Sequence, residues 1–156
     1  MNSNRSVSAA IGEYLVLGEL LKRNIEAYLA HGETQKGWDV VICTNESTKR
    51  VQVKTIDWPK QQAVNGRFAD DFNYLVVVLL DRQNPRSRFF VFDHEELDAL
   101  LSSPNLERRD RNRTLTMSKK SIASSMKLHE DNWKILQPAR SESRQDVLSA
   151  EPVSAF

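Results

Sequence analysis

The chain lacks several features that would point to particular classes of protein. It contains one cysteine among 156 residues, so no intramolecular disulfide can form. Its longest apolar runs, Tyr74–Leu80 and Phe89–Phe92, are far shorter than the roughly 20 residues that span a membrane. The segment Met1–Ser6 has no apolar core like that of a secretory signal, which predicts a cytoplasmic protein without membrane contact. Cys43 ends an apolar run, so we expect its thiol to be buried and to serve packing.

Motifs of several common chemistries are also missing. The three histidines, His31, His94 and His129, show no spacing suited to zinc. The segment Gly12–Gly18 lacks the Gly-Lys-Ser/Thr ending of a phosphate-binding loop, and no serine sits in a nucleophile elbow. The net charge of +1 excludes little, because basic residues gathered on one face can bind DNA in a nearly neutral protein.

The composition is that of a soluble globular protein, with 40% hydrophobic and 28% charged residues. A chain of 156 residues can form one domain with a real core and is too short for two ordinary ones. We expect a single domain over residues 1–138. The last segment, 139–156, has little to bury and is expected to be a disordered tail.

The hydrophobic pattern predicts an α/β (α+β) domain with a mixed sheet. The first helix is apolar on nearly all sides, which predicts that it is buried. A polar connection is expected at 57–71, and an amphipathic piece at 127–136. Asp93 is placed to cap the second helix. We expect helices at 8–24 and 93–102 and strands at 25–30, 38–43, 50–56, 74–80 and 88–92, the second and third strands forming a hairpin.

Polar side chains on two neighbouring strands form the most informative feature of the sequence. Asp39 opens one strand, and Gln52 and Lys54 alternate with Val51 and Val53 on the next, so Gln52 and Lys54 face the same side. Mg²⁺ binds oxygen ligands, often only one or two carboxylates plus waters. Asp39, the Gln52 amide oxygen and the Val53 carbonyl can supply such ligands, and Lys54 can hold an attacking water. The alternative is a hairpin with polar side chains facing solvent.

Glu13 lies on the first helix among apolar residues. A buried, unpaired carboxylate is costly, so Glu13 would need a metal, a cation or a hydrogen-bond donor. In a metal site it could bind a metal-bound water or a second ion. At the helix edge it could instead reach solvent or an arginine.

The sequence resembles the PD-(D/E)XK phosphodiesterase superfamily in the motif formed by Glu13, Asp39 and the segment Gln52–Lys54. The resemblance extends from about Gly12 to Leu101. It implies the restriction-endonuclease-like fold, in which helices flank a mixed central sheet with an αβββαβ core. Small members with a similar arrangement include Holliday-junction resolvases and intron-associated homing endonucleases.

Carried over to this chain, the resemblance implies that Asp39 and Gln52 bind metal, that Lys54 is the catalytic lysine and that Glu13 is an accessory acid. It also implies Mg²⁺ as cofactor, with Mn²⁺ able to replace it. The chain departs from the usual motif at Trp38, where proline is common, and at Gln52, where most members carry Asp or Glu. One fewer negative charge should weaken metal binding until a scissile phosphate supplies the missing oxygen.

Basic residues that could contact DNA lie in two segments. The polar stretch 58–68 can reach base edges, although Trp58 could equally form a dimer contact. The basic stretch 108–120 can contact phosphates or can be a solvated loop. The predicted DNA-binding residues are Lys60, Arg67, Arg108, Arg109, Arg111, Arg113, Lys119 and Lys120.

These observations favour a metal-dependent DNA endonuclease. One active site cuts one strand, so a double-strand or junction cut predicts a homodimer or a larger closed homo-oligomer. A second hypothesis keeps the fold without the chemistry, as an inactive module that binds nucleic acid or a partner protein. A third is a small interaction or immunity-type protein that uses the loop around Trp58.

Overall fold

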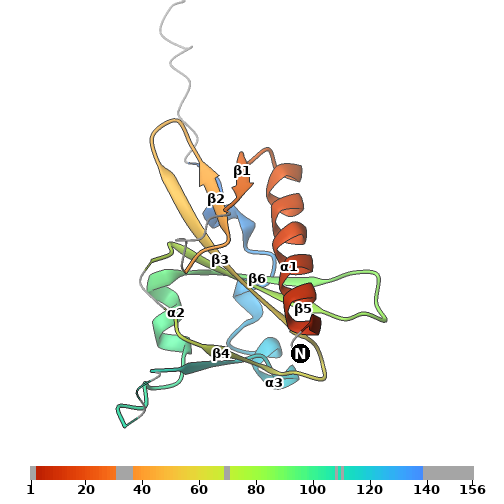
Figure 1. Cartoon of the computed structure of the whole chain (residues 1–156), viewed down its shortest axis with the longest axis vertical. Helices are drawn as coiled ribbons and strands as arrows, with labels where there is room; N and C mark the ends of the chain where they lie inside the picture. Colours follow the sequence, from red (N-terminus) through yellow and green to blue (C-terminus); the bar gives the residue numbers. More distant parts are fainter. Residues whose placement is uncertain (1–2, 31–36, 69–70, 108, 110, 139–156) are drawn as a thin grey trace, which may run out of the picture.

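The computed structural model describes residues 3–30, 37–68, 71–107, 109 and 111–138 (Figure 1). The predicted tail at 139–156, the polar turn at 31–36 and Arg108 lie outside the described residues. The elements follow in the order α1 (Ser3–Lys22), β1 (Ala27–Leu29), β2 (Val40–Cys43), β3 (Thr48–Asp57), β4 (Ala63–Gly66), β5 (Tyr74–Leu80), β6 (Arg88–Asp93), α2 (His94–Leu100), β7 (Arg113–Thr116), α3 (Lys119–Ala123) and two 3₁₀ turns, η1 (Lys127–His129) and η2 (Trp133–Leu136).

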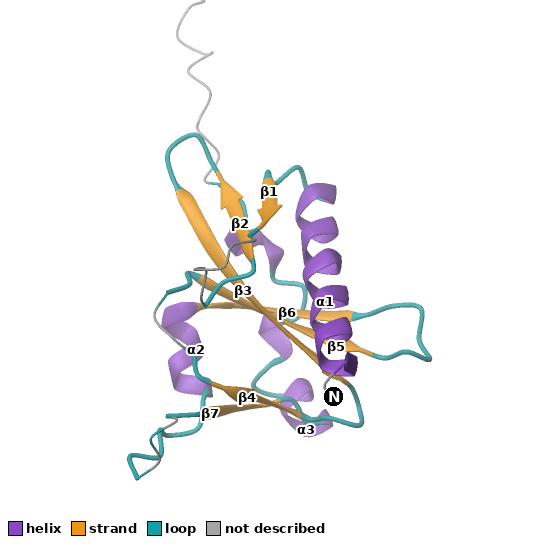
Figure 2. Cartoon of the chain, in the orientation of Figure 1, coloured by secondary structure: helices purple, strands orange, loops and turns teal. Residues whose placement is uncertain are grey.

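Five strands form the main sheet in the order β1-β2-β3-β5-β6 (Figure 2). β3 and β5 are parallel, and the other neighbours are antiparallel. The mixed sheet that the sequence predicted is therefore confirmed. The chain crosses from β3 to the parallel β5 through a segment that contains β4, and α2 comes only after β6.

β5 lies inside the sheet and is buried on both faces, as its uninterrupted apolar run predicted. Its side chains alternate between two apolar clusters. Val76 and Val78 join a cluster with α1, whereas Leu75, Val77 and Leu79 join a cluster with α2, β4, β7 and α3. The sheet therefore has α1 and η2 on one face and α2, β4, β7 and α3 on the other.

α1 begins at Ser3, five residues before the predicted start, and packs on the sheet through a single stripe. The buried stripe is Ser8, Gly12, Val16 and Leu20. The prediction that the helix is buried all round is wrong, because three large apolar side chains are at least half exposed. They are Val7 (51%), Tyr14 (63%) and Leu21 (51%).

Gly12 sets the distance between α1 and the sheet. A Cβ atom at this position would lie 1.8 Å from Thr55 Oγ1 and 3.0 Å from Thr55 Cβ. No side chain larger than hydrogen fits such a gap without movement of the helix, of β3 or of the Thr55 side chain. The glycine therefore lets α1 approach β3 next to Lys54.

β4 and β7 form a separate antiparallel pair, the β4–β7 ribbon (Figure 2). The prediction that 57–71 is a connection without secondary structure is wrong, because this segment contains β4. The stretch 108–120 is likewise not one loop, since it contains β7 and the start of α3. Val64 and Leu115 are the buried residues of the ribbon, and both pack in the cluster with α2.

The smaller elements follow local sequence signals. The Asp93 side chain caps α2 by accepting a hydrogen bond from Glu95 N–H, as predicted, and the Ser118 hydroxyl caps α3 in the same manner through Ser121 N–H.

Cys43 is half-buried, so the prediction of a buried thiol is wrong. Among the described residues, no helix is long and apolar enough to cross a membrane.

Candidate active site

The strand pairing places Asp39 beside Gln52. Val40 pairs with Val51 in the antiparallel β2–β3 ladder, and Asp39 N–H donates a 2.8 Å hydrogen bond to the Val51 carbonyl. Asp39 thus directly precedes β2 and is still hydrogen-bonded to β3. Gly37 has a φ of 90°, a conformation that favours glycine, and turns the chain into this position.

The Asp39 carboxylate is held by the backbone of β3. Its Oδ2 accepts a hydrogen bond of 2.7 Å from Val53 N–H. Burial raises the pKa of the Asp39 carboxyl above its ordinary value, although the Val53 N–H and the positive charge of Lys54 act in the opposite direction. A partly desolvated carboxylate of this kind is stabilised by a nearby cation.

Two more oxygen atoms belong to neighbouring residues of β3. The N–H and C=O of one strand residue point to the same side, so the Val53 carbonyl points toward Asp39, beyond the end of the β2–β3 ladder. Gln52 is only 7% exposed, and its Oε1 is buried without a hydrogen-bond partner. Buried polar atoms in folded proteins normally have a partner, so this amide oxygen is placed to accept one.

Lys54 lies two residues further along the same face of β3 and is half-buried. A Cβ atom at Gly66 of β4 would lie 3.8 Å from Lys54 Nζ. The amine therefore sits beside the end of the β4–β7 ribbon. Sequence reasoning missed this neighbour, because Asn65-Gly66 is typical of a turn and gave no sign of a paired strand.

This set of donors fits a hard divalent cation. Asp39 would supply a charged oxygen, Gln52 a neutral one and Val53 its backbone carbonyl, which is an oxygen set that Mg²⁺ accepts. Among the described residues, no three His, Cys, Asp or Glu side chains cluster in a way that could hold a metal. Of the three residues, Asp39 alone has an acidic side chain.

Glu13 lies on α1, one residue after the close approach of Gly12 to Thr55. The helix packs on the sheet face of Val51 and Val53, whereas Gln52 and Lys54 belong to the other face. Glu13 is half-buried on the flank of the helix and interacts with other groups. Its role as an accessory acid stays a prediction.

The comparisons with known proteins support the fold. No protein-family model matches the sequence, and no curated protein does. Among solved structures, the chain is similar to a bacterial homing endonuclease, I-Ssp6803I, with a TM-score of 0.55 and 16% identity, over 84% of this chain and 89% of that one. The fold is restriction-endonuclease-like. At this identity the likeness concerns the fold alone.

The predicted DNA-binding residues divide into two groups. Lys60, Arg67, Arg109, Arg111, Lys119 and Lys120 are exposed. Arg113 instead binds within the protein, where its guanidinium donates to the Asp98 carboxylate, the Asp98 carbonyl and the Ser102 carbonyl. Its side chain therefore has a structural role, and its phosphate contact stays a prediction. The hydrogen bond from the Arg113 guanidinium, together with its positive charge, lowers the pKa of the Asp98 carboxyl.

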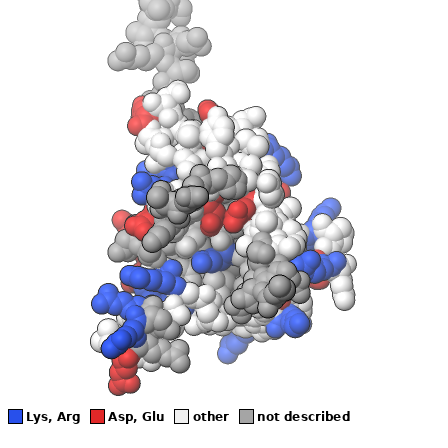
Figure 3. All heavy atoms as spheres, in the orientation of Figure 1, with Lys and Arg blue, Asp and Glu red and all other residues white. Residues whose placement is uncertain are grey.

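The surface near the middle of the molecule combines both signs of charge. Figure 3 shows acidic side chains at the centre of this face, with Lys and Arg side chains below them and at both sides. Acidic and basic side chains therefore lie near one another on this face.

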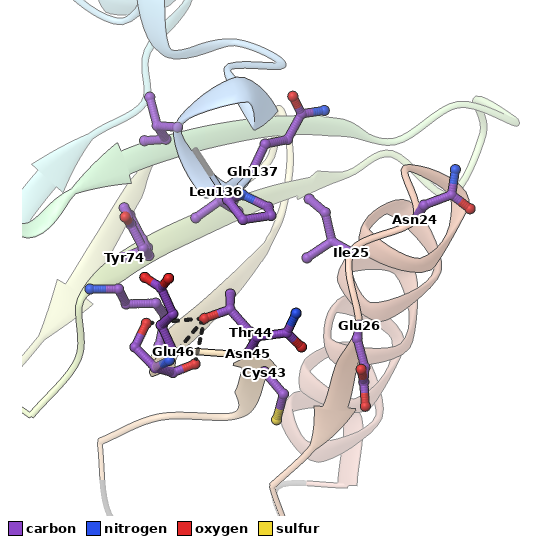
Figure 4. A pocket seen from close by; sticks show the side chains of 14 residues that line it. Asn24, Ile25, Glu26, Cys43, Thr44, Asn45, Glu46, Tyr74, Leu136 and Gln137 are labelled. Atoms are coloured by element: carbon purple, nitrogen blue, oxygen red, sulfur yellow. Dashed lines mark hydrogen bonds between the residues drawn. The ribbon is translucent and has the colours of Figure 1, made fainter. Parts of the chain in front are cut away.

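A pocket of about 540 Å³ lies away from these residues (Figure 4). It is formed by the turn after α1, the β2–β3 hairpin and the end of the described chain, with Glu26, Cys43, Tyr74 and Leu136 in its lining. None of Asp39, Gln52, Lys54 and Glu13 lines it. The candidate active site along β3 is therefore separate from this pocket.

Proposed function

We propose that this chain is a metal-dependent DNA endonuclease of the PD-(D/E)XK type. The observation that carries the proposal is the anchoring of the Asp39 carboxylate at Val53 N–H, between Gln52, whose Oε1 is buried without a hydrogen-bond partner, and Lys54. The restriction-endonuclease-like fold supports it, since a bacterial homing endonuclease has a similar fold.

Each residue has a role that follows from its place. Asp39, Gln52 and the Val53 carbonyl would hold Mg²⁺, or Mn²⁺ in its place. A bound divalent cation neutralises the charge that develops on a phosphate under attack. Lys54 orients the attacking water and neutralises a phosphate oxygen. Val53 N–H fixes the Asp39 carboxylate, so that one oxygen stays directed to the site.

The same reasoning extends to assembly. One such site cuts one strand of DNA, so we propose that a homodimer or larger closed homo-oligomer makes a double-strand cut. Exposed basic residues, Lys60, Arg111 and Lys119 among them, would bind the phosphate backbone.

The test is cleavage of supercoiled plasmid and of a synthetic four-way junction with Mn²⁺, by wild type and by Lys54→Ala. We expect nicking or resolution by wild type and a loss of at least about 100-fold in Lys54→Ala, since one charge-stabilising group is worth this much. Equal cutting by both proteins would show that the site is assigned wrongly. Thermal unfolding of Lys54→Ala checks that the variant is folded.

A second candidate function rests on Gln52. With an amide where most members carry an acid, the chain could be a nuclease-fold module that binds nucleic acid or a partner protein without cutting it. Gln52→Glu separates the two functions. In an enzyme it should keep or raise metal-dependent cutting, whereas in a binding module it should produce none.

A further inference from the structure

The β4–β7 ribbon has two unlike faces. Val64 and Leu115 point inward and are buried, and Gly66 on the same face lies beside Lys54. Side chains alternate along a strand, so the residues between them point outward. The outward face comprises Ala63, Asn65, Thr114 and Thr116, and Arg67 directly follows β4.

This outward face is polar and carries no acid. Asn65, Arg67 and Thr116 are exposed, and Ala63 and Thr114 are half-exposed. The inner face already supplies the packing that the ribbon needs, so the stability of the fold does not explain the choice of side chains outside. A surface with amide, guanidinium and hydroxyl groups suits hydrogen bonding to a nucleic acid.

The structure holds Asn65 in one orientation. The Thr114 hydroxyl donates a 2.6 Å hydrogen bond to Asn65 Oδ1 across the two strands. The amide group keeps its N–H donors, and its oxygen keeps a second lone pair. An asparagine of this kind can bind adenine through two hydrogen bonds, and an arginine can bind guanine through two.

The ribbon is anchored firmly at both ends. At one end, Met117 N–H donates to the Gln62 carbonyl and the Trp58 indole N–H donates to the Met117 carbonyl. Near the other end, Ser102 and Thr114 exchange hydrogen bonds, since Ser102 N–H donates to the Thr114 carbonyl and Thr114 N–H to the Ser102 hydroxyl. A surface fixed in this manner loses little conformational entropy on binding.

We infer that the outer face of the β4–β7 ribbon reads base edges in the major groove of duplex DNA, with Asn65 and Arg67 as the residues that select bases. The inference rests on the proposed function, because it places the scissile phosphate at Lys54. Lys54 adjoins the inner side of Gly66, and Asn65 and Arg67 are the chain neighbours of Gly66, so a duplex with its phosphate at Lys54 would meet their side chains at this end of the ribbon. The major groove admits a two-stranded ribbon of this kind.

The experiment is in vitro selection from a duplex library with a randomised core, in Ca²⁺ so that bound DNA stays uncut. Wild type is compared with Asn65→Ala, Arg67→Lys and the control Asn45→Ala, which removes an exposed asparagine from the β2–β3 hairpin. We expect wild type and Asn45→Ala to enrich the same sequence. Asn65→Ala should lose its preference at one base pair by about 5- to 100-fold.

Arg67→Lys separates base reading from charge. Lysine keeps the positive charge but cannot form the planar two-bond contact, so the preference for one guanine should fall while the salt dependence of binding stays the same. Circular dichroism of each variant shows that it is folded.

The outcomes that would overturn the inference are distinct from those that would overturn the proposed function. If wild type binds DNA without any sequence preference, or if Asn65→Ala and Arg67→Lys select as wild type does, the ribbon does not read bases and the nuclease proposal stands. If wild type retains no DNA at low salt, both are wrong.

Discussion

Position 52 sets the charge of the site. With glutamine there, Asp39 is the one ionised group among the three proposed ligands, and the buried Gln52 Oε1 adds an oxygen without charge. The affinity of oxygen sites for divalent cations depends on their number of charged ligands. A scissile phosphate brings both an oxygen and a negative charge. Metal binding and DNA binding should therefore strengthen each other.

We predict that Gln52→Glu binds Mn²⁺ more tightly than wild type in the absence of DNA, by about 10-fold or more, since it adds a charged oxygen. Titration calorimetry or the electron paramagnetic resonance signal of free Mn²⁺ measures this. Gln83→Glu, in the exposed turn after β5, adds the same charge elsewhere and should change nothing. Wild type should gain affinity when DNA is present. Equal Mn²⁺ affinity of wild type with and without DNA would contradict the coupling.

We predict that the Asp39 carboxylate lowers the stability of the metal-free protein at neutral pH. Burial raises the pKa of its carboxyl, so the group favours folding most at pH below the ordinary aspartate value, and this contribution is lost as the pH rises through the raised pKa. In EDTA at pH 7, Asp39→Asn should therefore melt at a higher temperature than wild type, and the difference should shrink toward acid pH.

Thermal unfolding of both proteins between about pH 3 and about pH 8 gives this comparison. The lower limit is roughly one unit below the ordinary aspartate pKa, and the upper limit is above neutral pH. Excess Mg²⁺ should stabilise wild type and leave Asp39→Asn unchanged. A variant that is less stable than wild type by the same amount at every pH would show that the Val53 hydrogen bond outweighs the cost of burial.

At the scale of elements, the contact between α1 and β3 positions the site. β3 carries Gln52 and Lys54 on one face and Thr55 on the other, where Gly12 allows the helix to lie close. A shift of the helix would move β3 at the residue next to the proposed catalytic lysine. Glycine at this position is therefore needed for geometry and not for flexibility.

We predict that Gly12→Ala lowers the free energy of unfolding by about 1–3 kcal/mol, because the added methyl group meets a stiff β-branched side chain. Gly18→Ala is the matched control on the same helix. No atom lies within 4 Å of a Cβ there, so alanine should raise the stability by about 0.5–1 kcal/mol through its helix propensity. Urea unfolding measures both. A stable Gly12→Ala protein would show that the contact adjusts at little cost.

The elements that local pattern determines could be predicted from the sequence. β5, the β2–β3 hairpin, the cap at Asp93 and the shared face of Gln52 and Lys54 all follow from patterns within about ten residues. β4 and β7 could not be predicted, because each has four residues and forms only by pairing with the other, about 50 positions away. The pairing of Arg113 with Asp98 and the nearness of Lys54 to Gly66 could not be predicted either, because both depend on tertiary structure and not on a local pattern.

The side of α1 that is buried also escaped prediction. Apolar residues surround the helix, so hydrophobicity did not distinguish its faces. The buried stripe contains Ser8 and Gly12, which are small and let the helix approach the sheet. Val7, Tyr14 and Leu21 remain exposed.

At the scale of the whole molecule, the distribution of basic residues matters more than the net charge of +1. Lys60 is exposed after β3, whereas Arg113 is held by Asp98 and Ser102. We predict that Lys60→Ala reduces the slope of log affinity for DNA against log salt by about 1. Arg113→Ala should leave that slope unchanged and lower the melting temperature. Fluorescence anisotropy at several salt concentrations measures the slope. A smaller slope in Arg113→Ala but not in Lys60→Ala would show that Arg113 contacts phosphate and that Lys60 does not.

The central claim is that the Asp39 site cleaves phosphodiester bonds. The most direct test is the rate at which supercoiled plasmid is nicked in Mn²⁺ by wild type and by Asp39→Asn, measured with enzyme in excess. The variant is expected to be at least as stable as wild type, so loss of activity cannot be assigned to unfolding. We predict nicking by wild type and none by Asp39→Asn. Nicking at the same rate by both proteins would contradict the account.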